Sequence, residues 1–88
     1  MTHMTQASGS ILVLVPSSVV RSITHTEDDG SQWAWPRGAG AITSLRALVK
    51  RGLASETTGI CEGCSSHRAG HEVPVFHIFE GVDLKSRD

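Results

Sequence analysis

A helical repeat dominates this sequence between Gly38 and Arg51. Its apolar residues recur at three- and four-residue spacing, as in an amphipathic α-helix: Ile42, Leu45, Leu48 and Val49. Gly52 follows where glycine commonly ends a helix, and Leu53 would make the apolar contact that accompanies such an end. We therefore predict a helix over residues 38–51. A chain of 88 residues must pack its other elements around this helix as one small domain.

The other apolar segments are short and suit β-strands. Ile11–Val15 is a continuous run of leucine and β-branched residues closed by Pro16, which fits a strand buried on both faces. Residues 17–26 suit a helical turn or a strand, because a potential cap at Ser17 precedes residues of high β propensity. Strands are expected within 11–15, 18–26, 31–35, 54–58 and 73–79. The predicted fold class is α+β, a single domain with one main helix packed on a small, mostly antiparallel sheet.

The limits of this domain follow from the polarity of the chain. We predict that residues 1–10 form a disordered tail, that residues 11–82 form the domain, and that residues 83–88 form a polar C-terminal tail.

With 39% hydrophobic residues and a net charge of -1, the composition is typical of a soluble globular chain. The longest apolar run falls far short of the roughly 20 residues of a membrane-spanning helix. No basic region precedes that run as in a signal peptide, so we expect a cytoplasmic protein without a membrane partner.

Charge is unevenly distributed along the chain. Glu27, Asp28 and Asp29 precede Gly30, and this acidic turn signal predicts a hairpin tip. Residues 31–55 contain no carboxylate, and their basic residues form a local positive element: Arg37, Arg46, Lys50 and Arg51. Because DNA binding depends on neutralising phosphates, a near-neutral domain would have to bind DNA through such a local element.

Trp33 and Trp35 stand two residues apart, so in an extended segment both indoles point to one face. The first interpretation places them in the core, since the chain has few other aromatic residues to bury. The second is an exposed pair that binds a partner or stacks on bases. We expect the helix and the tryptophans to form the core.

Metal-binding residue types gather in the segment 59–72. Cys61, Cys64, His67 and His71 form the pattern C-x2-C-x2-H-x3-H. Zinc prefers thiolate and imidazole ligands in tetrahedral geometry, and a C-x2-C turn presents two sulfurs to one ion. Zinc fingers usually place about a dozen residues between the two ligand pairs, whereas only Ser65 and Ser66 intervene here.

Three interpretations of this Cys/His loop stay open. A structural zinc ion held by the four residues would offset the cost of ordering a long loop in a domain with little core. The segment would otherwise be a solvated loop with two reduced cysteines, since cytosolic thiols normally stay reduced. The third interpretation is a redox-active or reversible disulfide pair, because a C-x2-C cysteine at the start of a helix can have a lowered pKa.

Residues 36–56 read PRGAGAITSLRALVKRGLASE and are followed by a loop and VPVFHIFEG. This half of the chain resembles the second half of a winged helix-turn-helix domain, in which a recognition helix precedes a two-stranded wing. The resemblance implies that the exposed helix side faces the major groove of DNA and that Arg51 or Arg68 meets a phosphate. The DNA-binding residues that it implies are Thr43, Arg46, Lys50 and Arg51. In that family two helices precede the recognition helix, whereas residues 11–35 offer a strand-like run, an ambiguous segment and the tryptophan pair.

Two functions follow as expectations. The first is a small non-enzymatic protein that binds duplex DNA or modulates transcription and whose wing is stabilised by a structural zinc ion. The alternative is a protein-interaction module that uses Trp33 and Trp35 or the Cys/His loop, such as a phage-type accessory protein that inhibits a host factor. An enzyme is not expected, because the sequence has no Ser-His-Asp set and no glycine-rich phosphate loop. A thin core and an open hairpin edge make a homodimer a reasonable expectation.

Overall fold

The computed structural model describes residues 10–61 and 71–87. Its elements run in the order β1 (Ile11–Val15), α2 (Ser17–Arg21), β2 (Ile23–Thr26), β3 (Gln32–Ala34), α3 (Ala39–Lys50), β4 (Ala54–Cys61), β5 (His71–Ile78) and β6 (Val82–Ser86). This is the predicted α+β class, with α3 as the main helix. No helix within these described ranges is long and apolar enough to cross a membrane.

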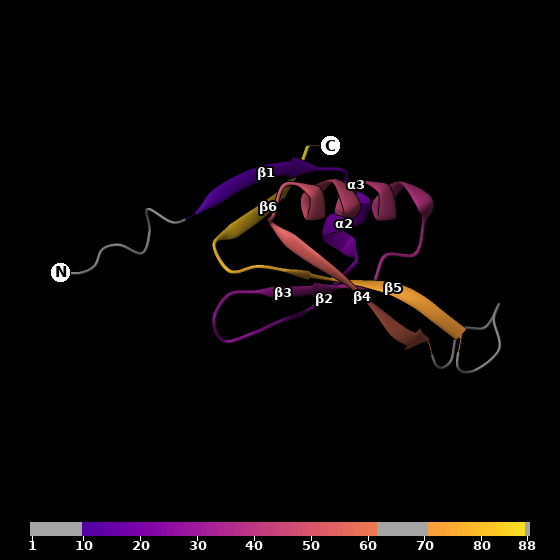
Figure 1. Cartoon of the computed structure of the whole chain (residues 1–88). Helices are drawn as coiled ribbons and strands as arrows, with labels where there is room; N and C mark the ends of the chain where they lie inside the picture. Colours follow the sequence, from indigo (N-terminus) through magenta and orange to yellow (C-terminus); the bar gives the residue numbers. More distant parts are fainter. Residues whose placement is uncertain (1–9, 62–70, 88) are drawn as a thin grey trace.

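The strands form two separate sheets. Four strands make an antiparallel sheet in the order β2-β3-β5-β4, whereas β1 and β6 pair in parallel as a two-stranded ribbon. Figure 1 shows the helices and the ribbon on the same side of the four-stranded sheet, above it in this view. No helix or strand of the described segments covers the opposite face of this sheet. That open face is the setting of the candidate site.

α3 lies within its predicted limits and ends as predicted. The residue after its C-cap, Gly52, adopts φ 77, a left-handed conformation that glycine adopts readily. The Leu53 N–H donates to the carbonyl oxygen of Leu48 at 3.0 Å, and the Gly52 N–H donates to that of Val49 at 3.0 Å. This pair of hydrogen bonds is the motif with which glycine ends a helix. The helix therefore stops where the apolar repeat of the sequence stops.

The core lies between the helices, the ribbon and the upper face of the four-stranded sheet. Its largest fully buried side chains are Val19, Leu45, Phe76 and Ile78. Neither tryptophan belongs to this core, so the prediction that α3 and the tryptophans form it is wrong for the tryptophans. The reason is the alternation of side chains along an extended segment. Ala34 points into the core and is fully buried, so Trp33 and Trp35 on either side of it point to the open face.

The acidic segment forms the predicted hairpin tip between β2 and β3. The Gly30 N–H donates to the carbonyl oxygen of Glu27 at 3.0 Å, and the Glu27 N–H donates to that of Ser31 at 2.8 Å. Gly30 adopts φ 94, which suits the residue that closes such a turn. Before the turn, the ambiguous residues 17–26 divide into α2 and β2, so each interpretation holds for one half of that segment.

The C-terminal segment differs from its prediction as a tail. Residues 82–86 form β6, which runs parallel to β1 and pairs Val13 with Leu84. Val82 and Leu84 point into the core and are 7% and 9% exposed. The prediction of a polar tail over residues 83–88 is therefore wrong for residues 83–86. These residues form a strand because the alternating apolar side chains of β6 pack into the core and its backbone pairs with β1 at the other end of the described chain. Residues 1–9 of the predicted N-terminal tail lie outside the described residues.

β1 has the predicted bounds but a different environment. Val13 and Val15 face the core, whereas Leu12 and Leu14 are 62% and 57% exposed. The prediction of a strand buried on both faces is therefore wrong. The ribbon has one face on the core and one face in solvent, as a two-layer arrangement allows.

Candidate partner-binding surface

A row of aromatic rings crosses the open face of the four-stranded sheet. In the strand register, His25 of β2 pairs with Trp33 of β3, and Trp33 pairs with His77 of β5. The rings of Trp33 and His77 stack with their centroids 4.4 Å apart and their planes at 18°. The ring of Phe79 meets that of His77 edge to face at 5.8 Å. We call these residues and the neighbouring Trp35 the aromatic face.

The aromatic face is partly open to solvent. Trp33, Trp35 and His77 are half-buried, while His25 and Phe79 are exposed. Paired rings at such distances are worth about 0.5–1.5 kcal/mol beyond their buried area, so they hold one another in position. A fixed group of exposed rings is a surface that a partner can bury without first ordering it.

Trp35 lies across β4 at Gly59. A Cβ atom added to Gly59 would lie 2.7 Å from the Cη2 atom of Trp35 and 2.6 Å from the Cγ2 atom of Val75. Val75 of β5 is only 3% exposed although it lies on the open face of the sheet. Glycine in the strand therefore gives the indole room to pack on the backbone of the sheet. Trp35 is in part a structural residue of this face, which leaves Trp33 and His77 as the better probes of binding.

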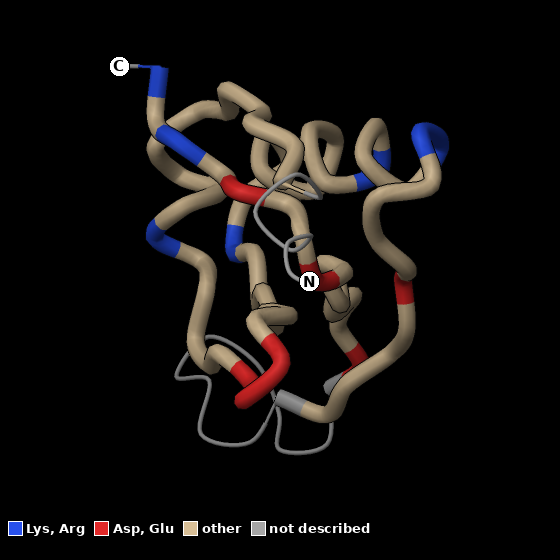
Figure 2. Tube along the Cα trace, turned by 90° about the vertical axis from the view of Figure 1, so that its left-hand side faces the viewer, with Lys and Arg blue, Asp and Glu red and all other residues tan. Residues whose placement is uncertain are grey.

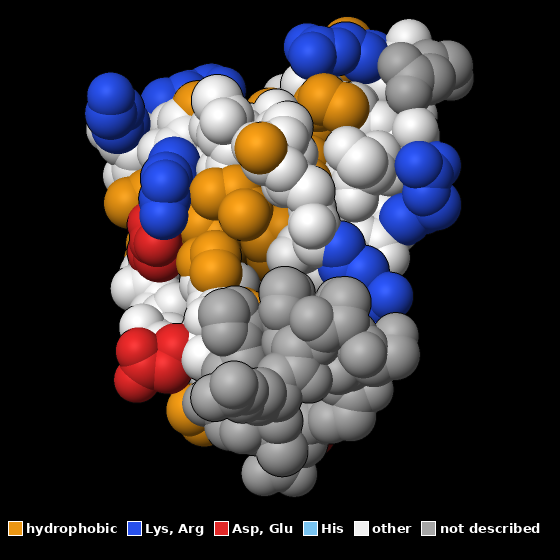
Figure 3. Space-filling view, turned by 90° about the vertical axis from the view of Figure 1, so that its right-hand side faces the viewer, with side chains coloured by type: hydrophobic (Ala, Val, Ile, Leu, Met, Phe, Trp, Pro, Cys, Tyr) orange, Lys and Arg blue, Asp and Glu red, His pale blue; other side chains and the backbone are white. Residues whose placement is uncertain are grey.

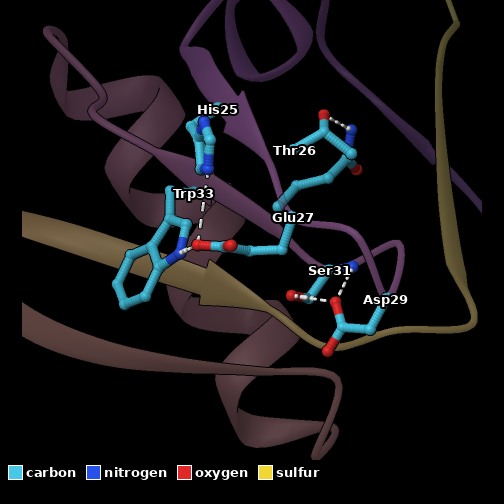
Figure 4. A network of polar contacts seen from close by, with 7 residues as sticks. His25, Thr26, Glu27, Asp29, Ser31 and Trp33 are labelled. Atoms are coloured by element: carbon cyan, nitrogen blue, oxygen red, sulfur yellow. Dashed lines mark hydrogen bonds and ion pairs between the residues drawn. The ribbon is translucent and has the colours of Figure 1, made fainter.

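Glu27 links the aromatic row to the hairpin tip. The Trp33 indole N–H donates to Oε2 of Glu27 at 3.0 Å, and Nε2 of His25 lies 3.5 Å from the same oxygen. Figure 4 shows His25 and Trp33 directed toward this carboxylate from adjacent strands. The hydrogen bond satisfies the one polar atom of the indole and fixes the ring orientation.

The hairpin tip adds further negative charge beside the rings. Asp29 accepts hydrogen bonds from the Ser31 hydroxyl at 2.7 Å and the Ser31 backbone N–H at 2.8 Å. The hydroxyl first and then the backbone N–H hold the pKa of Asp29 below its ordinary value. A shallow open depression is lined by Trp33, His77 and Ser31 together with the acidic residues Glu27, Asp28 and Asp29. In Figure 2 most Asp and Glu residues lie in the lower half of the molecule, where this tip is, and Lys and Arg gather in the upper half.

The residues predicted to bind DNA lie on or next to α3. Thr43, Lys50 and Arg51 are exposed, in agreement with an outward-facing helix side. Arg46 is also exposed but is engaged by the next strand. Its Nε and Nη2 atoms donate to the two carboxylate oxygens of Glu56 at 3.1 and 3.0 Å, a bidentate ion pair between α3 and β4. This partner was not predicted, because Glu56 lies ten residues further along the chain and becomes a neighbour of Arg46 only when β4 folds back.

The predicted metal ligands are described only in part. Cys61 and His71 are register partners at the last pair of the β4–β5 hairpin. The first and last residues of the Cys/His motif are thus brought together by the backbone. Cys64 and His67 lie outside the described residues. Within the described ranges, no group of three or more potential ligands comes together to hold a metal ion.

His25 and His77 belong to the aromatic face, and the sequence did not predict this role for either residue. Each alternates with residues of the opposite sheet face, which is the pattern of a half-exposed strand, but alternation does not reveal that both join the row of Trp33. No protein-family model, curated protein or solved structure shows significant similarity to this chain.

Proposed function

We propose that this protein is a protein-interaction module that binds a partner chain through its aromatic face. The observation that carries the proposal is the row formed by His25, Trp33 and His77 on a sheet face that no described element covers. Exposed groups of apolar and aromatic side chains mark interaction surfaces, and tryptophan is enriched among the residues that dominate binding energy. This supports the alternative expectation from the sequence.

The charge beside the rings indicates the chemistry of the partner. Glu27, Asp28 and Asp29 form a negative rim along one side of the Trp33 and His77 rings. Phosphate groups would be repelled there, which disfavours base stacking of a nucleic acid on these rings. Lysine or arginine side chains would be attracted by the carboxylates, and their cations also bind the face of an indole. The partner that fits is a protein surface with basic residues beside apolar ones.

The proposal is tested by capture of partner proteins with the full chain and with Trp33→Ala. We expect the variant to lose a captured protein while keeping the far-ultraviolet circular dichroism spectrum and unfolding midpoint of a folded chain. Thr43→Ala, on the exposed side of α3, is the matched control and should retain the partner. The same partner should dissociate as salt is raised, because the rim attracts it by charge. Retention by Trp33→Ala, or equal loss in Thr43→Ala, contradicts the proposal.

Duplex DNA binding through α3 is the second candidate, favoured by the exposed Thr43, Lys50 and Arg51 along this helix. The β4–β5 hairpin follows α3 in the chain as a wing follows a recognition helix. Figure 3 shows Lys and Arg side chains around the upper part of one end of the molecule, with apolar side chains between them. If this candidate is correct, the full chain shifts duplex DNA at low salt and Lys50→Ala with Arg51→Ala removes the shift. A full chain that leaves DNA unshifted at low salt excludes it.

A structural zinc ion at the Cys/His loop is compatible with either function. Cys61, Cys64, His67 and His71 would provide two thiolates and two imidazoles, a ligand set that zinc accepts in structural sites. Its role would be to tie the far end of the β4–β5 hairpin.

A further inference from the structure

We propose that two copies of this chain associate through the free edge of β1, in antiparallel register about a two-fold axis at Val13. The association would join the two ribbons into one four-stranded sheet in the order β6-β1-β1-β6. This inference is independent of the proposed function, because the edge of β1 belongs to the ribbon and not to the sheet that carries the aromatic face.

The hydrogen bonds of β1 show which backbone groups are directed to this edge. The Ile11 N–H donates to the carbonyl oxygen of Gly81 at 2.6 Å, and the carbonyl oxygen of Val15 accepts from the Arg87 N–H at 3.0 Å. In a parallel pair, a residue directs both its N–H and its C=O to the partner strand, and the next residue directs both away. The odd-numbered residues of β1 therefore face β6. Leu12 and Leu14 direct their N–H and C=O groups to the open edge.

The same two leucines are exposed on the outer side of the ribbon. Leu12 and Leu14 are 62% and 57% exposed, and Ile11 at the start of the strand is 43% exposed. In the register of the ribbon, Leu12 and Leu14 neighbour Asp83 and Lys85 of β6. The outer side is thus apolar along β1 and charged along β6. The apolar strand is the one at which a second ribbon would be added.

β1 lacks the charged side chains, the proline and the bulge that keep many edge strands from pairing. Proteins protect such edges with charged side chains, proline, bulges or a covering element. β1 has no charged residue and no proline, pairs with β6 without a bulge, and has no other strand partner among the described residues. A ribbon of only two strands is also marginally stable alone, and parallel strands are normally covered on both sides. The ribbon therefore has the properties of half of a larger sheet.

A second copy fits this edge because the edge is self-complementary. With a two-fold axis at Val13, Leu12 of each copy lies opposite Leu14 of the other. Antiparallel strands exchange two hydrogen bonds between such a pair and none at the next pair. The outward N–H and C=O groups of Leu12 and Leu14 would all be satisfied, with Val13 meeting its equivalent at the axis. Four leucine side chains would share one face of the joined sheet, and the valines of both copies would keep facing their own cores. Such a closed interface with the same patch on both sides is the common form of a homodimer.

The first test is sedimentation equilibrium of the full chain between micromolar and millimolar concentration. We expect a monomer–dimer equilibrium for the parent chain and a monomer for Leu14→Lys, which puts a charge on the edge. Ile60→Lys is the matched control, since Ile60 is an exposed aliphatic residue of another strand at 47% exposure. It should dimerise like the parent. A monomeric parent at all concentrations, a dimeric Leu14→Lys, or loss of the dimer in Ile60→Lys overturns the proposal.

A second variant keeps the test valid if Leu14→Lys fails to fold. Leu12→Pro removes only an N–H that is directed to the open edge, and proline is tolerated at edge strands. It should be folded and monomeric. Amide hydrogen exchange then tests the register, because Leu12 and Leu14 should gain protection as the concentration rises while Ile11 and Val13 stay equally protected. Protection of Leu12 and Leu14 that is independent of concentration would mean that another segment of the same chain occupies the edge, and would overturn the proposal.

Discussion

Gly59 shows how one residue sets the shape of the binding surface. An added Cβ would lie 2.6 Å from Val75 and 2.7 Å from Trp35, closer than van der Waals contact. We predict that Gly59→Ala lowers the free energy of unfolding by about 1–3 kcal/mol, the usual cost of overpacking. Gly40→Ala is the control, since Gly40 lies in the first turn of α3, nothing lies within 4 Å of its added Cβ, and alanine has a higher helix propensity than glycine. It should raise stability by roughly 1 kcal/mol in the same denaturant titration. If Gly59→Ala and Gly40→Ala changed the free energy of unfolding in the same direction, the packing of Trp35 on β4 would be contradicted.

Asp29 makes the hairpin tip sensitive to acid. Hydrogen bonds from Ser31 lower the pKa of Asp29 in the folded chain below its ordinary value, so its stabilising contribution is fully present above that ordinary value. The contribution is lost as the pH falls through the lowered pKa. We predict that the unfolding midpoint of the parent declines below about pH 4 and that Asp29→Asn reduces this decline. Asp28→Asn, at the adjacent turn position, should leave the decline as in the parent. Equal curves for the parent and Asp29→Asn would contradict the role of Ser31.

At the scale of elements, the ion pair between α3 and β4 determines how much positive charge the helix presents. Glu56→Gln would break a bidentate ion pair whose Arg46 and Glu56 side chains are 56% and 34% exposed. Because solvent screens partly exposed pairs, we predict a loss of stability of less than about 1 kcal/mol. If α3 binds DNA, the same variant should bind more tightly, because the freed guanidinium becomes available to a phosphate or base. Glu72→Gln is the control for net charge, because it removes one carboxylate from β5, the strand next to β4, and Glu72 does not pair with Arg46. Equal gains in both variants would show that net charge, and not Arg46, controls DNA affinity.

The β4–β5 hairpin is the element that a metal ion would stabilise. We predict about one zinc per chain in protein purified without a chelator, since Cys61 and His71 are already paired by the strands. A strong chelator should then lower the unfolding temperature, and Cys64→Ser should abolish both the metal and the effect of the chelator. Ser65→Ala, within the same loop, is the control and should behave like the parent. If the purified chain holds no metal and the chelator does not change its unfolding temperature, the zinc prediction is contradicted. The loop would then be a solvated or redox-active segment.

On the scale of the whole molecule, local patterns were predictable and distant pairings were not. The repeat and glycine stop of α3 and the turn at Gly30 depend on neighbouring residues, so sequence rules located both. The spacing of Trp33 and Trp35 predicted that they share a face, but which face they share depends on the burial of Ala34 by distant elements. The ion pair of Arg46 likewise depends on the path of β4. The sequence therefore identified the tryptophans of the candidate surface, but it did not predict that His25, His77 and Glu27 would contact Trp33 or each other.

The pairing of β1 with β6 joins the two ends of the described chain and makes the whole fold depend on its last strand. Leu84 packs into the core opposite Val13, although the surrounding residues read as a polar tail. We predict that Leu84→Ala costs about 2–5 kcal/mol in the free energy of unfolding, the range for a buried leucine. Lys85→Ala, the exposed neighbour on the same strand, should change stability by less than about 0.5 kcal/mol. If both substitutions were neutral in denaturant unfolding, β6 would be dispensable. The ribbon that offers the edge of β1 would then contribute little to the stability of the fold.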